Sequence, residues 1–170
     1  CSSAASDVYK RQVERRFEVI SNNIFNKGIT LVDDYGHHPE EIKATLETID
    51  KVWKDNKKVV IFQPHRYSRT KALFEEFVEI LSEIDDLILL DVYPASENII
   101  KGFESDDLLK AANKKNNIIK ANGVEDALLK LKELLNDHSL ILTQGAGNTS
   151  ALAKLILSLI HISEPTRRPI

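Results

Sequence analysis

The stretch Ile29-Thr-Leu-Val-Asp-Asp-Tyr-Gly-His-His-Pro39 passes from an apolar, strand-like run directly into the start of a helix. Gly36 permits a tight reversal of the backbone between the two. Pro39 suits the first turn of a helix, where its missing N–H is not needed, and two glutamates follow it at the positive end of the helix dipole. In an open α/β sheet, a polar turn between a strand end and a helix start is where ligands bind.

The same order of strand, polar turn and helix recurs along the chain. Strands are predicted at 29–32, 57–62, 86–91, 117–121 and 139–143, and helices at 39–54, 70–84, 105–113, 123–135 and 149–157. Strands that alternate with helices in this way call for right-handed crossovers in a mostly parallel sheet. The sequence therefore predicts one α/β domain, Rossmann-like and doubly wound, with helices on both faces of the sheet. The alternating segment 15–20 allows an antiparallel edge hairpin at the N-terminus.

The two ends of the chain, 1–12 and 158–170, have no amphipathic period and resemble translated sequencing-adapter read-through. We expect them to be non-native tails on either side of one domain that spans 13–157. The only cysteine, Cys1, falls in the first tail. The sequence therefore predicts no disulfide and no cysteine–metal chemistry for the domain.

Composition narrows the classes of function. The net charge is −3 and the two tails are basic on balance, so the domain is more acidic than the whole chain and a poor general nucleic-acid binder. The longest apolar run near the end, 151–160, is interrupted by Lys154 and Ser158 and is shorter than the roughly 20 residues of a membrane span. No secretory signal opens the chain, so we expect a cytoplasmic protein without nucleic-acid or membrane partners.

Four polar turns should meet at one edge of the sheet, because parallel strands end on the same side. They are 33–38, 63–70, 91–97 and 143–148. In the first turn, Asp34 can accept a ribose hydroxyl or reach a metal-bound water, or it can cap a helix instead. Tyr35 can stack on a flat ring.

The second turn carries two arginines, Arg66 and Arg69, with His65 beside them. If the helix has begun by then, the two arginines share a face. A guanidinium group grips a carboxylate or a phosphate in two-point geometry. The alternative is a solvated basic patch that pairs with Glu75 or Glu76. With His65 at the strand end, we favour an anion clamp.

Two adjacent histidines, His37 and His38, diverge from one another, so they cannot both bind one metal ion from the same side. With Asp33 and His65 they would make a zinc or manganese site, but the i, i+4 spacing of metal-binding helices is absent. We favour a ligand-facing role for one histidine and a plain helix cap for His38.

The turn Gly145-Ala-Gly147 lies between a strand and a helix and offers backbone N–H groups to an anion. Close packing of the helix on the strand explains the glycines slightly better. No Gly-x-x-x-x-Gly-Lys-Ser/Thr phosphate loop occurs, so a complete ATP site is not predicted.

Four motifs together resemble the C-terminal domain of the Mur ligases, and among them the UDP-N-acetylmuramate–L-alanine ligases of bacteria. The motifs are Asp33-Asp-Tyr-Gly-His-His-Pro39, Phe62-Gln-Pro-His-Arg-Tyr-Ser-Arg-Thr70, Asp91-Val-Tyr-Pro-Ala95 and Gln144-Gly-Ala-Gly-Asn148. The resemblance covers about 15–157. Mur ligases are three-domain cytoplasmic enzymes of peptidoglycan synthesis, in which the first domain holds the UDP-sugar, the central domain holds ATP and the last brings the amino acid.

The resemblance implies an ATP-dependent ligation, in which the sugar carboxylate becomes an acyl phosphate and the amine of L-alanine attacks it. The residues that it implies for the L-alanine pocket are Tyr35, His37, His65, Arg66 and Arg69, with an arginine on the carboxylate of the amino acid. It also implies that Asp34 holds the ribose of ATP. The implied cofactors are ATP and Mg2+, and the implied substrates are L-alanine, UDP-N-acetylmuramate and ATP.

The chain departs from the family pattern in lacking the UDP-sugar domain and the phosphate loop with its Mg2+ ligands. We therefore expect this chain alone to be inactive. Two other hypotheses remain. One is the related ligase that attaches a whole murein tripeptide to the same sugar in recycling, although Tyr67-Ser68 favours the alanine enzyme. The other is a stand-alone nucleotide- or anion-binding module that uses the turn at Gly145.

Overall fold

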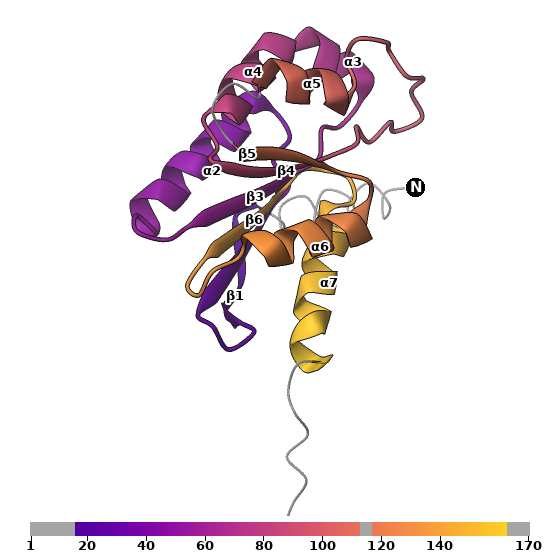
Figure 1. Cartoon of the computed structure of the whole chain (residues 1–170). Helices are drawn as coiled ribbons and strands as arrows, with labels where there is room; N and C mark the ends of the chain where they lie inside the picture. Colours follow the sequence, from indigo (N-terminus) through magenta and orange to yellow (C-terminus); the bar gives the residue numbers. More distant parts are fainter. Residues whose placement is uncertain (1–15, 113–116, 163–170) are drawn as a thin grey trace, which may run out of the picture.

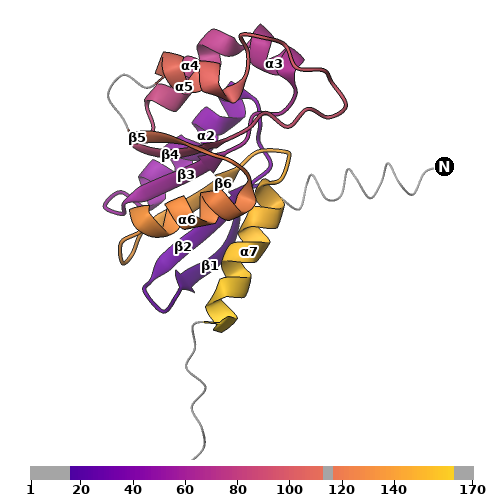
Figure 2. The ribbon, with the colours of Figure 1, turned by 45° about the vertical axis from the view of Figure 1, so that its right-hand side comes forward.

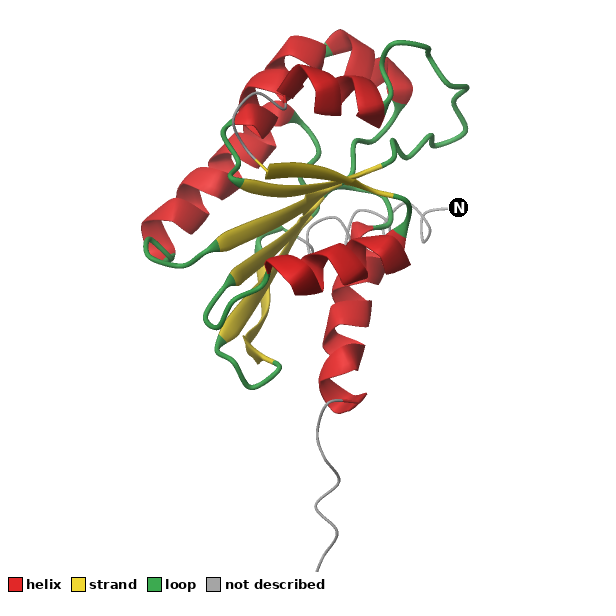
Figure 3. Cartoon of the chain, in the orientation of Figure 1, coloured by secondary structure: helices red, strands yellow, loops and turns green. Residues whose placement is uncertain are grey.

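The computed structural model describes residues 16–112 and 117–162, with side chains as far as Leu159. The strands are β1 (Glu18–Ile24), β2 (Ile29–Asp34), β3 (Lys58–Phe62), β4 (Asp86–Leu90), β5 (Asn117–Ala121) and β6 (Leu140–Gln144). The helices are α2 (Pro39–Val52), α3 (Tyr67–Ala72), α4 (Phe74–Ser82), α5 (Ser105–Ala112), α6 (Val124–Leu134) and α7 (Thr149–Ile162) (Figures 1 and 3).

The strands form one sheet in the order β1-β2-β6-β3-β4-β5. Every neighbouring pair is parallel except β1 and β2, which form an antiparallel hairpin at the edge. The predictions of a mostly parallel sheet and of an edge hairpin are therefore confirmed. Because β6 inserts between β2 and β3, the last residues of all three strands, Asp34, Gln144 and Phe62, lie side by side. The turns that follow these strands consequently emerge together.

Successive residues of each central strand point to opposite faces of the sheet, and both faces are buried. Val60 and Phe62 pack with α2, α4 and α5, while Val59 and Ile61 pack with α6 and α7. Figure 2 shows these two helical layers on either side of the strands. The prediction of helices on both faces is confirmed. This double cover fixes the strand ends and so positions the turns that follow them.

Helix α2 begins with several stabilising contacts. His38 is its N-cap, and its Nδ1 accepts a bond from the backbone N of Glu40 at 3.4 Å. The carboxylate of Glu41 accepts bonds from the backbone N–H groups of His37 and His38 at 3.0 and 3.1 Å. Such reciprocal capping satisfies N–H groups that have no partner inside the helix. The prediction that His38 caps this helix is confirmed.

The single helix expected at 70–84 is wrong in two respects. The helical segment begins earlier, at Tyr67, and it is interrupted at Leu73, whose φ of −117° and ψ of 24° end α3 and begin α4. The break leaves the apolar spacing unchanged because Leu73 N still donates to Arg69 O, and Phe77 N to Leu73 O. The sequence pattern therefore could not reveal it.

Helix α7 ends at Ile162, five residues past the end predicted at Leu157, so the expected tail boundary at 158 falls within this helix. The other parts of the expected tails, 1–12 and 163–170, lie outside the described residues. Within the described part of the chain, no helix combines the length and the apolarity needed to cross a bilayer.

Candidate functional site

Four rings from three separate segments form a row at the end of the parallel strands. Tyr35 and His37 follow β2 and meet edge to face, with ring centroids 5.3 Å apart. The rings of His37 and His65 are 5.5 Å apart, and His65 stacks on Tyr93 at 5.4 Å with only 13° between the ring planes. We call Tyr35, His37, His65 and Tyr93 the aromatic row. The predicted convergence of the first three turns is therefore found.

His65 is held from two sides. A pair of backbone bonds, from Tyr93 N to Pro64 O and from Arg66 N to Tyr93 O, both 2.8 Å long, fixes its peptide to the loop after β4. On the ring side, Arg69 Nη1 lies 3.2 Å from His65 Nδ1 and 3.1 Å from His65 O. Burial, and then the cationic groups of His37, Arg69 and Arg66, lower the pKa of His65 to about 4. His65 is therefore neutral near pH 7.

His37 is half-buried beside it. Its Nδ1 lies 3.2 Å from the carbonyl oxygen of Tyr35. Burial lowers the pKa of His37, although the bond to the carbonyl of Tyr35 acts in the opposite direction. The carboxylate of Glu41 stays ionised close by: burial would raise its pKa, but the N–H groups of His37 and His38 hold that pKa below its usual range.

Arg66 and Arg69 have separate surroundings rather than one shared face. Arg66 is exposed, and its backbone has a φ of 71°, in the left-handed region that is unfavourable for a side chain of this size. In the part of the chain that the structure describes, its guanidinium makes no hydrogen bond or ion pair. Arg69 instead turns back to His65. Arg66 is thus the more exposed of the two guanidinium groups.

Asp34 is almost completely buried, with 6% of its surface exposed. Its Oδ2 accepts bonds from Thr45 Oγ1 and from Gln144 Nε2, the latter at 3.0 Å. Among the described residues, the one donor to its Oδ1 is the backbone N of Phe17, through a long bond of 3.3 Å. The role of Asp34 at a ribose stays a prediction, and Oδ1 is the oxygen with capacity left for it.

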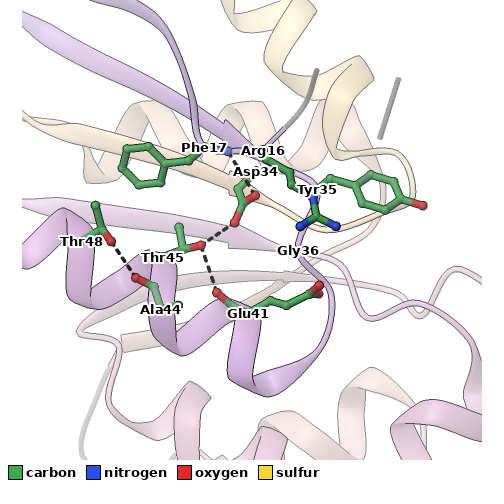
Figure 4. Close-up of a pocket in the computed structure, with 9 residues that line it drawn as sticks. All are labelled: Arg16, Phe17, Asp34, Tyr35, Gly36, Glu41, Ala44, Thr45 and Thr48. Carbon is green, nitrogen blue, oxygen red and sulfur yellow. Dashed lines mark hydrogen bonds between the residues drawn. The ribbon is translucent and has the colours of Figure 1, made fainter. Parts of the chain in front are cut away.

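A pocket of about 300 Å3 opens beside Asp34 (Figure 4). The residues that line it are Arg16, Phe17, Asp34, Tyr35, Gly36, Glu41, Ala44, Thr45 and Thr48. In Figure 4, the Tyr35 ring points away from Asp34 and Thr45. Tyr35 therefore belongs both to the lining of this pocket and to the aromatic row.

The turn Gly145-Ala-Gly147 packs against Gln63. A Cβ on Gly147 would collide with Gln63 Oε1, and a Cβ on Gly145, whose φ is 137°, would lie 2.8 Å from Gln63 O. The side chain of Gln63 accepts a bond from Asn148 N at 2.5 Å and donates one to Asp91 O at 3.0 Å. Close packing thus accounts for the glycines, and an N–H group that an anion would need is already bonded.

Several residues of the site were not assigned a role from sequence. Gln63, Tyr93 and Gln144 lie inside the quoted motifs, which is the signal that could have found them. Thr45 carries no such signal, because its bond to Asp34 joins positions 11 residues apart. Among the described residues, no group of three or more His, Cys, Asp or Glu side chains is arranged to hold a metal ion.

Comparison with known proteins adds to this geometry. Residues 15–147 match the family model described as "Mur ligase, glutamate ligase domain". The chain is 47% identical over 147 residues to the UDP-N-acetylmuramate–L-alanine ligase of Hydrogenovibrio crunogenus, covering 84% of this chain and 32% of that protein. It is 44% identical over 147 residues to the ligase of the same name from Methylococcus capsulatus, covering 85% and 31%. The chain spans about a third of the length of these curated relatives.

Solved structures share the fold at lower identity. The UDP-N-acetylmuramate–alanine ligase of Thermotoga maritima superposes with a TM-score of 0.63 at 23% identity, over 88% of this chain and 30% of that chain. A murein peptide ligase of Psychrobacter arcticus superposes with a TM-score of 0.64 at 17% identity, over 92% and 31%. Each of these solved chains contains one region with the architecture described above.

Proposed function

This chain belongs to the Mur ligase family, and from that premise we propose that it is the amino-acid-binding, C-terminal domain of a cytoplasmic ligase that joins L-alanine to UDP-N-acetylmuramate in peptidoglycan synthesis. The observation that carries the proposal is the identity of 44–47% to two ligases of that name. A match of that extent necessarily includes 35–93, which holds the aromatic row and both arginines.

The site suits a small zwitterion. An α-amino acid presents a carboxylate and an amine a few ångströms apart, and it needs a cation for the first and acceptors for the second. Arg66 offers an exposed guanidinium that makes no hydrogen bond or ion pair with the described residues, and a guanidinium is the group best suited to grip a carboxylate at two points. His65 precedes Arg66 in the chain, and His37 lies against His65 with ring centroids 5.5 Å apart; both histidines are neutral near pH 7. Arg69 acts through His65, which it orients.

ATP would contact this domain through its ribose, at Asp34. Asp34 Oδ1 can accept a bond from a ribose hydroxyl, because the bond it already accepts is long. The family resemblance implies that the ATP phosphates and Mg2+ are held mainly by the central domain of the ligase, and the proposal keeps them there because the chain contains no Gly-x-x-x-x-Gly-Lys-Ser/Thr phosphate loop. ATP supplies the phosphoryl group that activates the sugar carboxylate.

A chimera tests the proposal. Residues 15–157 would replace the corresponding third of the Hydrogenovibrio crunogenus ligase, with the unmodified ligase as control. We expect phosphate release that depends on UDP-N-acetylmuramate, ATP and L-alanine together. This chain alone should release no ADP under the same conditions.

Two results would contradict the proposal. Turnover with a murein tripeptide but not with L-alanine would assign the domain to the recycling ligase. Binding of ATP by the isolated chain, with no response of chain or chimera to any amino acid, would favour a nucleotide-binding module. Hydroxylamine, which traps an acyl phosphate as a hydroxamate, shows whether the rest of the chimera is active.

A further inference from the structure

We propose that the Nε2 atom of His37 accepts the proton of the amine during ligation, and that His65 faces it with the opposite tautomer, as a hydrogen-bond donor. This inference rests on the proposed function and assigns different roles to the two histidines. It follows from whether the hydrogen-bond partner of each Nδ1 can donate or accept.

The partner of His37 fixes its tautomer. Nδ1 lies 3.2 Å from the carbonyl oxygen of Tyr35, and a carbonyl oxygen can only accept. Nδ1 therefore carries the hydrogen. In the neutral ring, the other nitrogen, Nε2, then keeps its lone pair and can accept a proton.

The partner of His65 fixes the reverse arrangement. Arg69 Nη1 lies 3.2 Å from His65 Nδ1, and a guanidinium can only donate. Nδ1 of His65 therefore holds the lone pair, and the hydrogen of the neutral ring is on Nε2. The two ring centroids are 5.5 Å apart, so a ring that offers an acceptor is neighbour to a ring that offers a donor. An ammonium group and a carboxylate require that combination.

The charged residues near His37 do not compete with its Nε2 for the proton of the amine. Arg69 on α3 and His38 on its own turn disfavour a cation there, while Glu41 on α2 favours one. Glu41 does not compete for the proton, because its carboxylate already accepts bonds from the N–H groups of His37 and His38. Asp34 does not compete either, since it is buried and bonded to Thr45 and Gln144. Burial lowers the pKa of His37, so its lone pair is free at neutral pH.

The proposed proton transfer precedes formation of the C–N bond. L-alanine binds as an ammonium, and one of its protons passes to His37 Nε2, which leaves a neutral amine with a lone pair. That nitrogen attacks the carbonyl carbon of the acyl phosphate, forming the C–N bond and a tetrahedral intermediate with a positively charged nitrogen and a negatively charged oxygen. The C–O bond to phosphate then breaks, and phosphate leaves with the electron pair and takes the second proton of the nitrogen as hydrogen phosphate. The imidazolium of His37 returns its proton to water.

NMR of the isolated chain can determine the tautomers of His37 and His65. Long-range 1H–15N NMR correlations distinguish a protonated from an unprotonated ring nitrogen. At pH 7.5 we expect the Nδ1–H form for His37 and the Nε2–H form for His65. Finding the Nε2–H form for His37 would overturn the proposal without bearing on the proposed function.

The chimera tests the catalytic role. In His37→Asn, the side-chain amide can still donate to Tyr35 O, but the acceptor at the Nε2 position is gone. We expect kcat with L-alanine to fall by about 10²–10⁴-fold, the usual range for a lost acid–base group. Hydroxylamine is a far weaker base than L-alanine and reaches the acyl phosphate without prior loss of a proton, so hydroxamate formation should be unchanged. The matched control is His38→Asn, which keeps a side chain able to cap α2.

The outcomes distinguish a failure of the proposed role of His37 from a failure of the proposed function. If the unmodified chimera uses L-alanine and His37→Asn uses it equally well, the role of His37 is overturned while the proposed function stands. Equal losses with L-alanine and with hydroxylamine would also overturn it, because the variant would then be damaged generally. A chimera that traps hydroxamate but never uses L-alanine overturns the proposed function itself.

Discussion

Arg69 contacts His65 at two points, with Nη1 3.2 Å from the ring nitrogen Nδ1 and 3.1 Å from the carbonyl oxygen. The first contact exists only while Nδ1 is unprotonated, and the charge of Arg69 opposes a second cation beside it. Replacing Arg69 by Gln should therefore raise the pKa of His65 above about 4. It should stay below the ordinary 6.5, because burial is the largest cause of the shift. An NMR titration of the His65 ring measures this change, and an unchanged pKa would contradict the proposed contact.

The depressed pKa of His65 makes the stability of the fold depend on pH. Between about pH 4 and 6.5 the unfolded chain binds a proton that the folded chain does not, so the free energy of unfolding falls as the pH is lowered through this window. Because the ring is only partly buried, we expect His65 to account for about 1–2 kcal/mol, well below the full value of the shift.

Urea unfolding at pH 7.5 and pH 4.5 measures that dependence, with His65→Gln as the comparison. The carboxylates and His37 are common to both proteins, so the difference reports on His65 together with its electrostatic coupling to His37. Equal losses of stability in the two proteins on acidification would show that His65 is not perturbed.

Thr45 and Thr48 lie one turn apart on α2 and differ in what their hydroxyls support. Thr45 is buried and donates to Asp34 Oδ2, while Thr48 donates to the carbonyl of Ala44, one turn back, and has no other hydrogen-bond partner among the described side chains. Thr45→Val leaves a buried carboxylate short of one donor and should cost about 1–3 kcal/mol at pH 7. Thr48→Val is the matched control and should change stability by less than about 0.5 kcal/mol. Similar unfolding midpoints for the two variants would argue against a structural role of the Asp34 bond.

Gly147 leaves the space that the side chain of Gln63 fills. A methyl group there would displace Gln63 Oε1 from Asn148 N and approach the Cβ of Tyr93 to 3.0 Å. Gly147→Ala should destabilise the fold by about 1–3 kcal/mol. The cost should be smaller when Gln63 is already Ala, because the displaced group is then absent. A double-mutant cycle by thermal unfolding tests this, and strictly additive costs would show that the two residues do not interact.

The sequence predicted the scaffold better than the contacts within the site. Strands such as 86–91 and helices such as 39–54 were foreseen because their apolar patterns are local. The break at Leu73 was missed because the apolar spacing runs through it unchanged. Arg66 and Arg69 were expected to share a face if the helix had begun by Arg66. The helix begins at Tyr67, and Arg69 turns back to His65.

Other parts of the site depend on contacts that no local pattern records. Gln63 matters because it fills the turn at Gly147, 84 residues further along the chain. Tyr93 matters because it stacks on His65. Both pairings form only when β3, β4 and β6 are brought together in the sheet, so residue type and spacing alone could not assign them.

The most direct test of the account is an NMR titration of the 15N-labelled chain with L-alanine, with propionate and ethylamine as ligands that carry only one of its two charged groups. We expect amide shifts clustered at 35–38 and 65–69 with L-alanine, a partial response at 65–69 with propionate, and little response to ethylamine. The contradicting result would be no shift in either segment, or shifts only in the turn at 145–148, at L-alanine concentrations that support turnover of the chimera.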